Sequence, residues 1–220
     1  MNRPLDLRLI VITDRGAAAP RAVRGIVAAA LAAGAPAIQL RDKDATAAEL
    51  LQQTSELLPL VRARGARLFV NDRLDVALAA GADGVHLGPD DLPVVVARRI
   101  APPGFFIGYS TDDPRLARDA ERDGASYIGC GAVFGSPTKH DTADEHIGTA
   151  RLDEVARAVT IPVVGIGGIT ADNVAEVAAT RAAGAAVVSA IMSAPDPAAM
   201  TRQLLHAFRK DPGALERRTT

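Results

Sequence analysis

The chain has no tryptophan, one cysteine and few aromatic residues, which make up 3% of its 220 residues. The single cysteine, Cys130, excludes an internal disulfide framework and favours a reducing cytoplasm as the location. Without tryptophan, a stacking platform for nucleic-acid bases is not expected. No apolar run reaches the roughly 20 residues that a membrane span needs, and the first residues lack a signal-peptide pattern. We therefore expect a soluble protein that binds neither nucleic acid nor membrane.

The charges of the chain are nearly balanced. Its formal net charge is −1 at pH 7, and its isoelectric point is near 6.4. Such a chain has no long-range field to attract a polyanion, so any anionic ligand must be held by local groups. The sequence leaves open whether the chain works alone or as a homo-oligomer.

Glycine-alanine pairs recur just before short apolar runs. Glycine accepts the left-handed conformation that ends a helix, and the runs that follow favour strand. The pairs are Gly34-Ala35, Gly65-Ala66, Gly81-Ala82, Gly124-Ala125 and Gly184-Ala185. Thr46 with Glu49 forms a capping box for a helix running toward Arg64. Thr170 is a candidate cap for a later helix, and Pro197 begins the last one.

Eight apolar runs are strand candidates, and helical patterns fill the gaps between them. The strands are expected at residues 9–13, 37–41, 68–71, 84–87, 105–109, 127–129, 163–166 and 186–189. The alternation predicts a single (β/α)₈ TIM barrel over residues 1–209, followed by a polar C-terminal tail at 210–220. An open doubly wound sheet is the alternative.

Polar side chains gather where the predicted strands end, which in a parallel barrel is one face. The second strand ends in the sequence QLRDK at 39–43, whose alternation aims Gln39, Arg41 and Lys43 to one side. The fork of arginine suits phosphate oxygens and lysine adds a movable positive charge, so the motif predicts an anion site. An ordinary exposed cluster of charged residues is the alternative.

Oxygen ligands follow the third and fourth strands. Asn71 and Asp72 close the third strand, and Asp91 lies just past the fourth. Mg²⁺ is typically held by one or two carboxylates, with substrate phosphates and water as its other ligands, so this spacing predicts a magnesium site. The alternative is that Asp72 or Asp91 caps the following helix. Asp83 and Asp90 are the weaker candidates.

Two further polar residues lie on the fourth and fifth strands. His86 is expected to be a hydrogen-bonded histidine of the core or near the site, without a catalytic role. Ser110 closes the fifth strand and completes the ring of polar groups. The alternative role of Ser110 is to cap the helix that begins near Asp112.

A second anion site is expected after strands seven and eight. The glycine-rich turn at 165–169 and the pair at 188–189 occupy the positions where barrels commonly bind phosphate. The glycines could instead permit tight packing. The loop at 134–139 adds two hydroxyls and a lysine, for which a solvated turn is the ordinary explanation. Two anion sites at one barrel mouth imply two phosphorylated substrates, and no residue pattern suggests covalent catalysis.

The order of these motifs resembles the thiamine-phosphate synthase family over nearly the whole predicted barrel. The matching segments are QLRDK at 39–43, ND at 71–72, DGVHLGPDD at 83–91, Ser110, FGSPTK at 134–139, GIGGI at 165–169 and VS at 188–189. The resemblance implies a Mg²⁺-assisted transferase that joins 4-amino-2-methyl-5-(diphosphooxymethyl)pyrimidine to a thiazole phosphate and releases diphosphate. Its partners would be these two small phosphorylated heterocycles.

The resemblance also implies a role for each matching residue. The pyrimidine diphosphate would be held by Gln39, Arg41, Lys43, Asn71, Ser110 and Lys139, and the thiazole phosphate by Ser136, Pro137, Thr138, Gly167, Val188 and Ser189. Leu40 and Asp42 belong to the first motif and are included among the substrate-binding residues. Asp72 and Asp91 would bind Mg²⁺. The expected catalytic residues are Arg41, Lys43, Ser110 and Lys139.

The chain departs from the family pattern at a few positions. Pro89 replaces a common glutamine, Gly135-Ser136 replaces Pro-Thr, and Ile10 or Val11 stands where an aromatic residue is common. A related thiazole tautomerase has a histidine after the sixth strand, which residues 131–133 lack. The alternative functions are those of a thiazole tautomerase-like enzyme or a phosphosugar isomerase on the same barrel, or of a non-catalytic sensor of phosphate ligands. A magnesium titration and an assay of diphosphate release distinguish these functions from the synthase.

Overall fold

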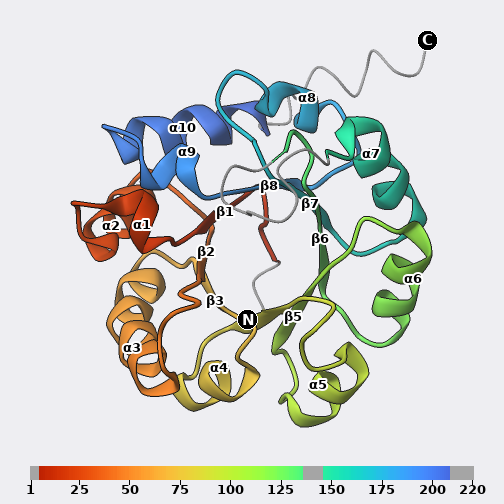
Figure 1. Cartoon of the computed structure of the whole chain (residues 1–220), viewed down its shortest axis with the longest axis horizontal. Coiled ribbons are helices and arrows are strands. Elements are labelled where there is room, and N and C mark those ends of the chain that lie inside the picture. Colours follow the sequence, from red (N-terminus) through yellow and green to blue (C-terminus); the bar gives the residue numbers. More distant parts are fainter. Residues whose placement is uncertain (1–4, 136–145, 209–220) are drawn as a thin grey trace.

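Eight parallel strands close into a barrel in the computed structural model, which describes residues 5–135 and 146–208 (Figure 1). The strands are β1 (Leu9–Ile12), β2 (Ala37–Leu40), β3 (Arg67–Asn71), β4 (Gly84–Leu87), β5 (Phe106–Ser110), β6 (Tyr127–Gly131), β7 (Val163–Ile166) and β8 (Gly184–Val187). Because β1 pairs with both β2 and β8, Ile10 lies opposite both Ala37 and Ala186. The predicted (β/α)₈ barrel is confirmed, and the open sheet is excluded.

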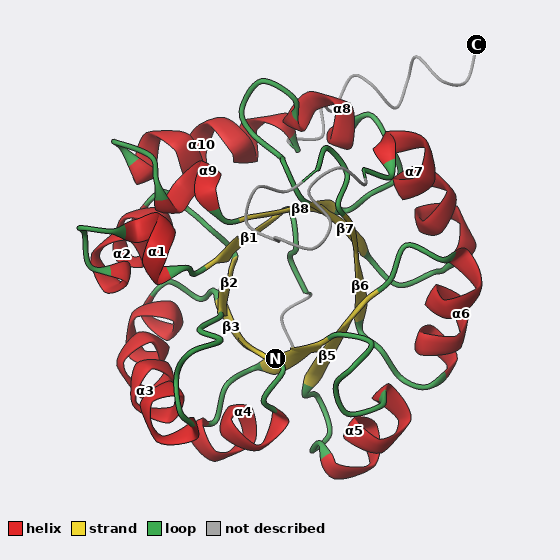
Figure 2. Cartoon of the chain, viewed as in Figure 1, coloured by secondary structure: helices red, strands yellow, loops and turns green. Residues whose placement is uncertain are grey.

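Helices surround the barrel as an outer ring (Figure 2). Those in the described part of the chain are α1 (Arg15–Ala18), α2 (Val23–Ala32), α3 (Ala47–Ala63), α4 (Leu74–Ala80), α5 (Val94–Ile100), α6 (Pro114–Arg122), α7 (Gly148–Ala158), α8 (Val174–Ala178), α9 (Ser189–Met192) and α10 (Pro197–Ala207). The short helices α1 and α9, which follow β1 and β8, are additions to the expected pattern. Among the described residues, no helix combines the length and apolar character needed to cross a bilayer.

Most of the predicted helix ends are confirmed. Gly34, Gly65, Gly81 and Gly124 have positive φ angles and follow α2, α3, α4 and α6. Gly184 was expected to end a helix, and this prediction is wrong. It lies within β8, where a Cβ atom would collide with the carbonyl oxygen of Leu7. Glycine is therefore needed there for a close approach of two backbones.

The cap predictions have two outcomes. The Thr46 hydroxyl accepts from the backbone N–H of Glu49 while the Glu49 carboxylate accepts from that of Thr46, so the capping box is confirmed. Helix α10 begins at Pro197, also as predicted. The prediction for Thr170 is wrong because Asn173 is the N-cap of α8 and its Oδ1 accepts from the Thr170 N–H at 2.8 Å.

Two apolar layers hold the barrel together. The outer layer packs between strands and helices and includes Leu40 and Val70, while the inner layer fills the barrel and includes Ile10, Phe69 and Tyr127. Successive strand residues point to opposite faces, so inward polar residues at the strand ends lie above this inner layer. The inner apolar layer therefore closes the barrel beneath the functional site.

Candidate active site

An amide pair joins the ends of β2 and β3. The Gln39 side chain, on a residue only 4% exposed, donates from Nε2 to Oδ1 of Asn71 at 2.7 Å. This bond uses the amide oxygen of Asn71 as an acceptor, and its NH₂ group still has donors to offer. Two residues that the sequence assigned to one substrate are therefore in contact.

Arg41 lies just past β2 and is tied to the end of β1. Its backbone N–H donates to Oγ1 of Thr13 at 2.9 Å, and its carbonyl accepts from the same hydroxyl at 3.1 Å. Its half-buried guanidinium lies with Nη1 3.6 Å from Oδ2 of Asp14. Sequence reasoning missed Thr13 and Asp14, although their position directly after the first strand is a signal that could have found them. Lys43 is exposed on the same loop.

The other two residues of the QLRDK motif, Leu40 and Asp42, contact the surrounding helices instead of the site. Leu40 is buried in the outer apolar layer. The Asp42 carboxylate accepts from Nε2 of Gln53 at 2.9 Å and pairs with the guanidinium of Arg15 at 3.0 Å. The structure does not bring these two side chains to the amide pair or to Asp72, so they support the loop that carries Arg41 and Lys43.

Asp72 and Asp91 bring two carboxyl groups together at the ends of β3 and β4. Asp72 has a φ angle of 63°, which non-glycine residues rarely adopt. The backbone N–H of Gly88 donates to Oδ2 of Asp91 at 2.6 Å and orients that carboxylate. Neither residue caps a helix, since α4 and α5 have no side-chain cap, and the capping alternative is therefore wrong. Asp83 instead pairs with Arg67 at the opposite end of β4.

The environment of Asp72 favours the arrival of a cation. Burial and the neighbouring Asp91 together raise the pKa of its carboxyl group to about 6, against the lowering effect of Lys43 and Arg41. Both basic side chains are thus close enough to act on the Asp72 carboxyl group. No third His, Cys, Asp or Glu joins the pair within residues 5–135 and 146–208. A pair of carboxylates fits Mg²⁺, which takes only one or two carboxylates in such sites and completes its shell with water and substrate phosphates.

The raised pKa of Asp72 predicts that Mg²⁺ binding weakens in mild acid. A protonated carboxyl group cannot serve as a ligand, so the apparent affinity should fall about tenfold per pH unit below pH 6 and level off above it. Calorimetric titration of the substrate-free protein with MgCl₂ at several pH values measures this slope. Asp72→Asn should abolish the slope, and an affinity independent of pH in the unmodified protein would exclude Asp72 as a ligand.

His86 and Ser110 are in direct contact across β4 and β5. Nε2 of His86 lies 2.8 Å from Oγ of Ser110, and Nδ1 lies 3.0 Å from the hydroxyl of Tyr127. Asp113 caps α6 with its own side chain, so the capping alternative for Ser110 is wrong. The expected hydrogen-bonded state of His86 is confirmed. Sequence reasoning missed Tyr127, whose place at the start of the sixth strand gave no functional signal.

The turn after β7 packs tightly against the segment after β6. A Cβ atom on Gly167 would lie 2.6 Å from Cβ of Ala132, and one on Gly168 would lie 2.7 Å from the carbonyl oxygen of Phe134. The packing explanation of these glycines therefore holds, alongside any contact with phosphate. Directly after the neighbouring strand β8, Val188 is half-buried and the exposed Ser189 begins α9. Ser136, Pro137, Thr138 and Lys139 lie outside the described residues.

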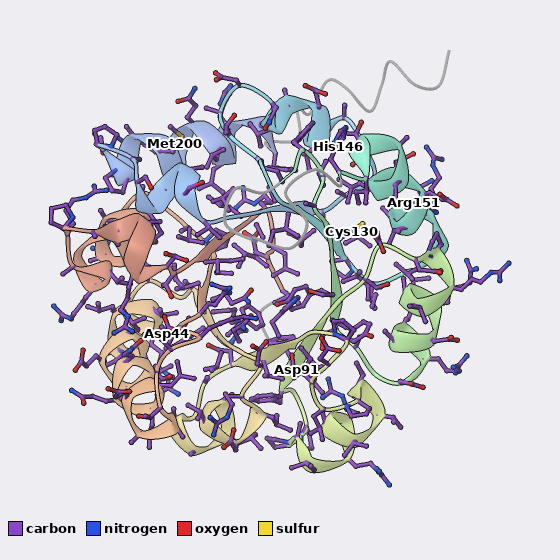
Figure 3. The ribbon with its side chains drawn as sticks, viewed as in Figure 1. Asp44, Asp91, Cys130, His146, Arg151 and Met200 are labelled. Carbon is purple, nitrogen blue, oxygen red and sulfur yellow. The ribbon has the colours of Figure 1, made fainter. Side chains whose placement is uncertain are left out.

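Figure 3 shows that two carboxylates near the motifs, Asp91 and Asp44, lie in different parts of the molecule. Asp91 lies inside the ring of helices, whereas Asp44 lies farther out, beside α3. Asp44 directly follows the QLRDK motif in sequence, yet it is exposed. Proximity in sequence to the motif is therefore not sufficient to place a carboxylate in the site.

A family model described as thiamine monophosphate synthase matches residues 9–191. The thiamine-phosphate synthase of Roseiflexus castenholzii is 53% identical over 194 residues, which cover 88% of this chain and 85% of that protein. The thiamine-phosphate synthase of Natronomonas pharaonis is 45% identical over 203 residues, covering 92% and 95% of the two chains.

A solved structure shares both fold and sequence with this chain. The thiamine phosphate pyrophosphorylase from Pyrococcus furiosus aligns with a TM-score of 0.85 at 43% identity, covering 94% of this chain and 97% of that one. The structure of 3-hexulose-6-phosphate synthase aligns with a TM-score of 0.66 at 20% identity, which shows likeness of fold alone.

Proposed function

This chain belongs to the thiamine monophosphate synthase family, and we propose that Asp72 and Asp91 hold a Mg²⁺ ion against the diphosphate of one substrate. The enzyme is a transferase that condenses 4-amino-2-methyl-5-(diphosphooxymethyl)pyrimidine with a thiazole phosphate to give thiamine phosphate and diphosphate. The observation that carries the metal proposal is the half-buried carboxylate pair beside Arg41 and Lys43.

The chemistry required of the site is stabilisation of a leaving group. When the bond between the exocyclic methylene and oxygen breaks, its electron pair departs on the diphosphate, and the nitrogen of the thiazole then bonds to the methylene. Bound Mg²⁺ would stabilise the charge on the diphosphate oxygens as a Lewis acid. No protein nucleophile is needed, because the aminopyrimidine itself delocalises the positive charge that the methylene gains.

Arg41 is prepared for the diphosphate before the substrate arrives. Asp14 and Thr13 hold its guanidinium and backbone, so little reorganisation is needed when charge develops nearby. The planar fork of arginine can meet two phosphate oxygens at once, whereas the exposed Lys43 adds a movable charge. We assign Lys139 a similar role from its place in the family motif.

The remaining residues divide between the two substrates. Gln39, Asn71 and Ser110 line the rim beside the carboxylate pair and would bind the pyrimidine diphosphate. Gly167, Val188 and Ser189 follow the neighbouring strands β7 and β8 and would bind the thiazole phosphate. We assign Ser136, Pro137 and Thr138 to that second phosphate from the sequence motif alone.

The reaction can be tested with the purified chain, both heterocyclic phosphates and MgCl₂. Thiamine phosphate and diphosphate should appear in equal amounts, and chelation of the metal should stop both. An isomerase would rearrange one substrate without releasing diphosphate, and a sensor would bind ligand without forming product. Either result would contradict the proposed function.

We also propose that the enzyme works in the cytoplasm on these two small phosphorylated heterocycles. The single cysteine, Cys130, is buried and unpaired with another cysteine, as is usual for a protein of a reducing compartment.

A further inference from the structure

A chain of hydrogen bonds crosses the inside of the barrel from β6 to β4 and β5. The hydroxyl oxygen of Tyr127 lies 3.0 Å from Nδ1 of His86, and Nε2 of the same imidazole lies 2.8 Å from Oγ of Ser110. Tyr127 is 1% exposed, whereas His86 and Ser110 are half-buried toward the mouth. The three side chains therefore run from the closed interior to the candidate site.

The burial of Tyr127 decides the direction of the first bond. In the described part of the chain, His86 is the hydrogen-bond partner of the phenol oxygen. If Nδ1 carried a hydrogen, the phenol hydrogen would be buried without an acceptor, which is costly. Burial also raises the pKa of Tyr127, which keeps the phenol protonated. The phenol therefore donates, and Nδ1 accepts.

The second bond follows from the first. An imidazole that accepts at Nδ1 carries its hydrogen on Nε2. That N–H donates to Oγ of Ser110 and uses one of its lone pairs. The hydroxyl hydrogen of Ser110 cannot then point back at His86, so it is available to an acceptor in the mouth of the barrel.

Two glycines of the barrel interior make room for this arrangement. A Cβ atom on Gly108 would overlap the Tyr127 ring and Nδ1 of His86, and one on Gly129 would lie 3.0 Å from Cε1 of His86. On its other side the Tyr127 ring meets the ring of Phe69 edge-on, with centroids 5.4 Å apart. The two rings are thus held in place by packing as well as by hydrogen bonds.

We propose that Tyr127 acts through His86 to fix the Ser110 hydroxyl as a hydrogen-bond donor to the diphosphate-bearing substrate. Tyr127 and His86 are positioning residues, and Ser110 is the group that touches the substrate. The proposal rests on the proposed function for its substrate, but the state of the imidazole does not depend on it. The NH₂ group of Asn71, on the neighbouring strand β3, would add a second donor to the same rim.

The imidazole state can be read without substrate. Long-range ¹H–¹⁵N spectra of the labelled protein show which nitrogen carries the hydrogen, and His86→Gln identifies the signals of His86. We expect hydrogen on Nε2 and none on Nδ1 in the unmodified protein, and a mixture of both forms in Tyr127→Phe. Hydrogen on Nδ1 in the unmodified protein, or an unchanged imidazole in Tyr127→Phe, would overturn the proposal whatever reaction the enzyme performs.

A double-mutant cycle separates positioning from packing. Tyr127→Phe and Ser110→Ala should each lower kcat about tenfold, as expected for one lost hydrogen bond. Because Tyr127 acts through Ser110, the double variant should be no slower than Ser110→Ala alone. Losses that multiply would overturn the proposal, even with the reaction itself intact.

The chain offers a matched control for this cycle. Tyr109, its other tyrosine, is half-buried and packs against the outer apolar layer, away from the barrel interior. Tyr109→Phe removes the same hydroxyl group and should leave kcat and the His86 signals unchanged. An equal loss in this control would show that removing a tyrosine hydroxyl disturbs the barrel generally, and would overturn the positioning role.

Discussion

Replacing Asp72 with asparagine should lower kcat by about 10² to 10³, the range typical of losing one charge-stabilising contact in an active site. Asparagine keeps the size of the side chain and removes its charge, so the carboxylate pair is reduced to Asp91 alone. The remaining site should bind Mg²⁺ poorly, and raising the metal concentration should restore only part of the activity. Diphosphate release measured over a series of MgCl₂ concentrations gives both quantities.

Asp90→Asn is the control for this variant. Asp90 is exposed and lies next to Asp91, so the substitution makes the same chemical change without touching the pair. Its kcat and magnesium response should match those of the unmodified enzyme. If Asp72→Asn behaved in the same way, the metal would have to be held elsewhere.

Gly108→Ala should damage the enzyme through its barrel interior. The new methyl group would overlap the buried Tyr127 ring and the half-buried His86 ring, which are packed against each other. Overpacking of this kind typically costs about 1–3 kcal/mol of unfolding free energy. Any shift of His86 also removes its bond to Ser110, so kcat should fall about tenfold even in the folded fraction. Chemical denaturation and kinetics on the same preparation measure both effects.

Gly25→Ala is the control for the glycine substitution. Gly25 lies within α2, and a Cβ atom there would meet no other atom within 4 Å. Because alanine favours a helix over glycine by about 1 kcal/mol, this variant should be slightly more stable and fully active. If Gly108→Ala were as stable and active as Gly25→Ala, the close packing around His86 would not be needed for function.

Local sequence patterns predicted most of the fold. The capping box at Thr46, the start of α10 at Pro197 and the glycines that end helices each depend on a few neighbouring residues. The prediction for Gly184 was wrong because glycine is needed there for another reason. The carbonyl oxygen of Leu7, which is distant in sequence, leaves no space for a side chain at that position. A contact between distant segments leaves no local pattern from which to predict it.

In the candidate site, too, some residues could be predicted from the sequence, whereas those that depend on contacts between distant segments could not. Asp72 and Asp91 were predicted as partners because adjacent strands of a parallel barrel end at one face, and the structure brings their carboxyl groups together. Tyr127 was missed because an aromatic residue in a strand usually serves the core, which it also does here. Its link to His86 depends on the pairing of β4, β5 and β6 and on a glycine between the two rings.

Binding of the metal itself tests the central claim most directly. Mn²⁺ can stand in for Mg²⁺, and its electron paramagnetic resonance signal reports how much of it is bound in the presence of inorganic diphosphate. The unmodified chain should bind a single ion, and the double variant Asp72→Asn, Asp91→Asn should bind none under the same conditions. Equal binding by the double variant would contradict the account, because the two carboxylates would then not hold the metal.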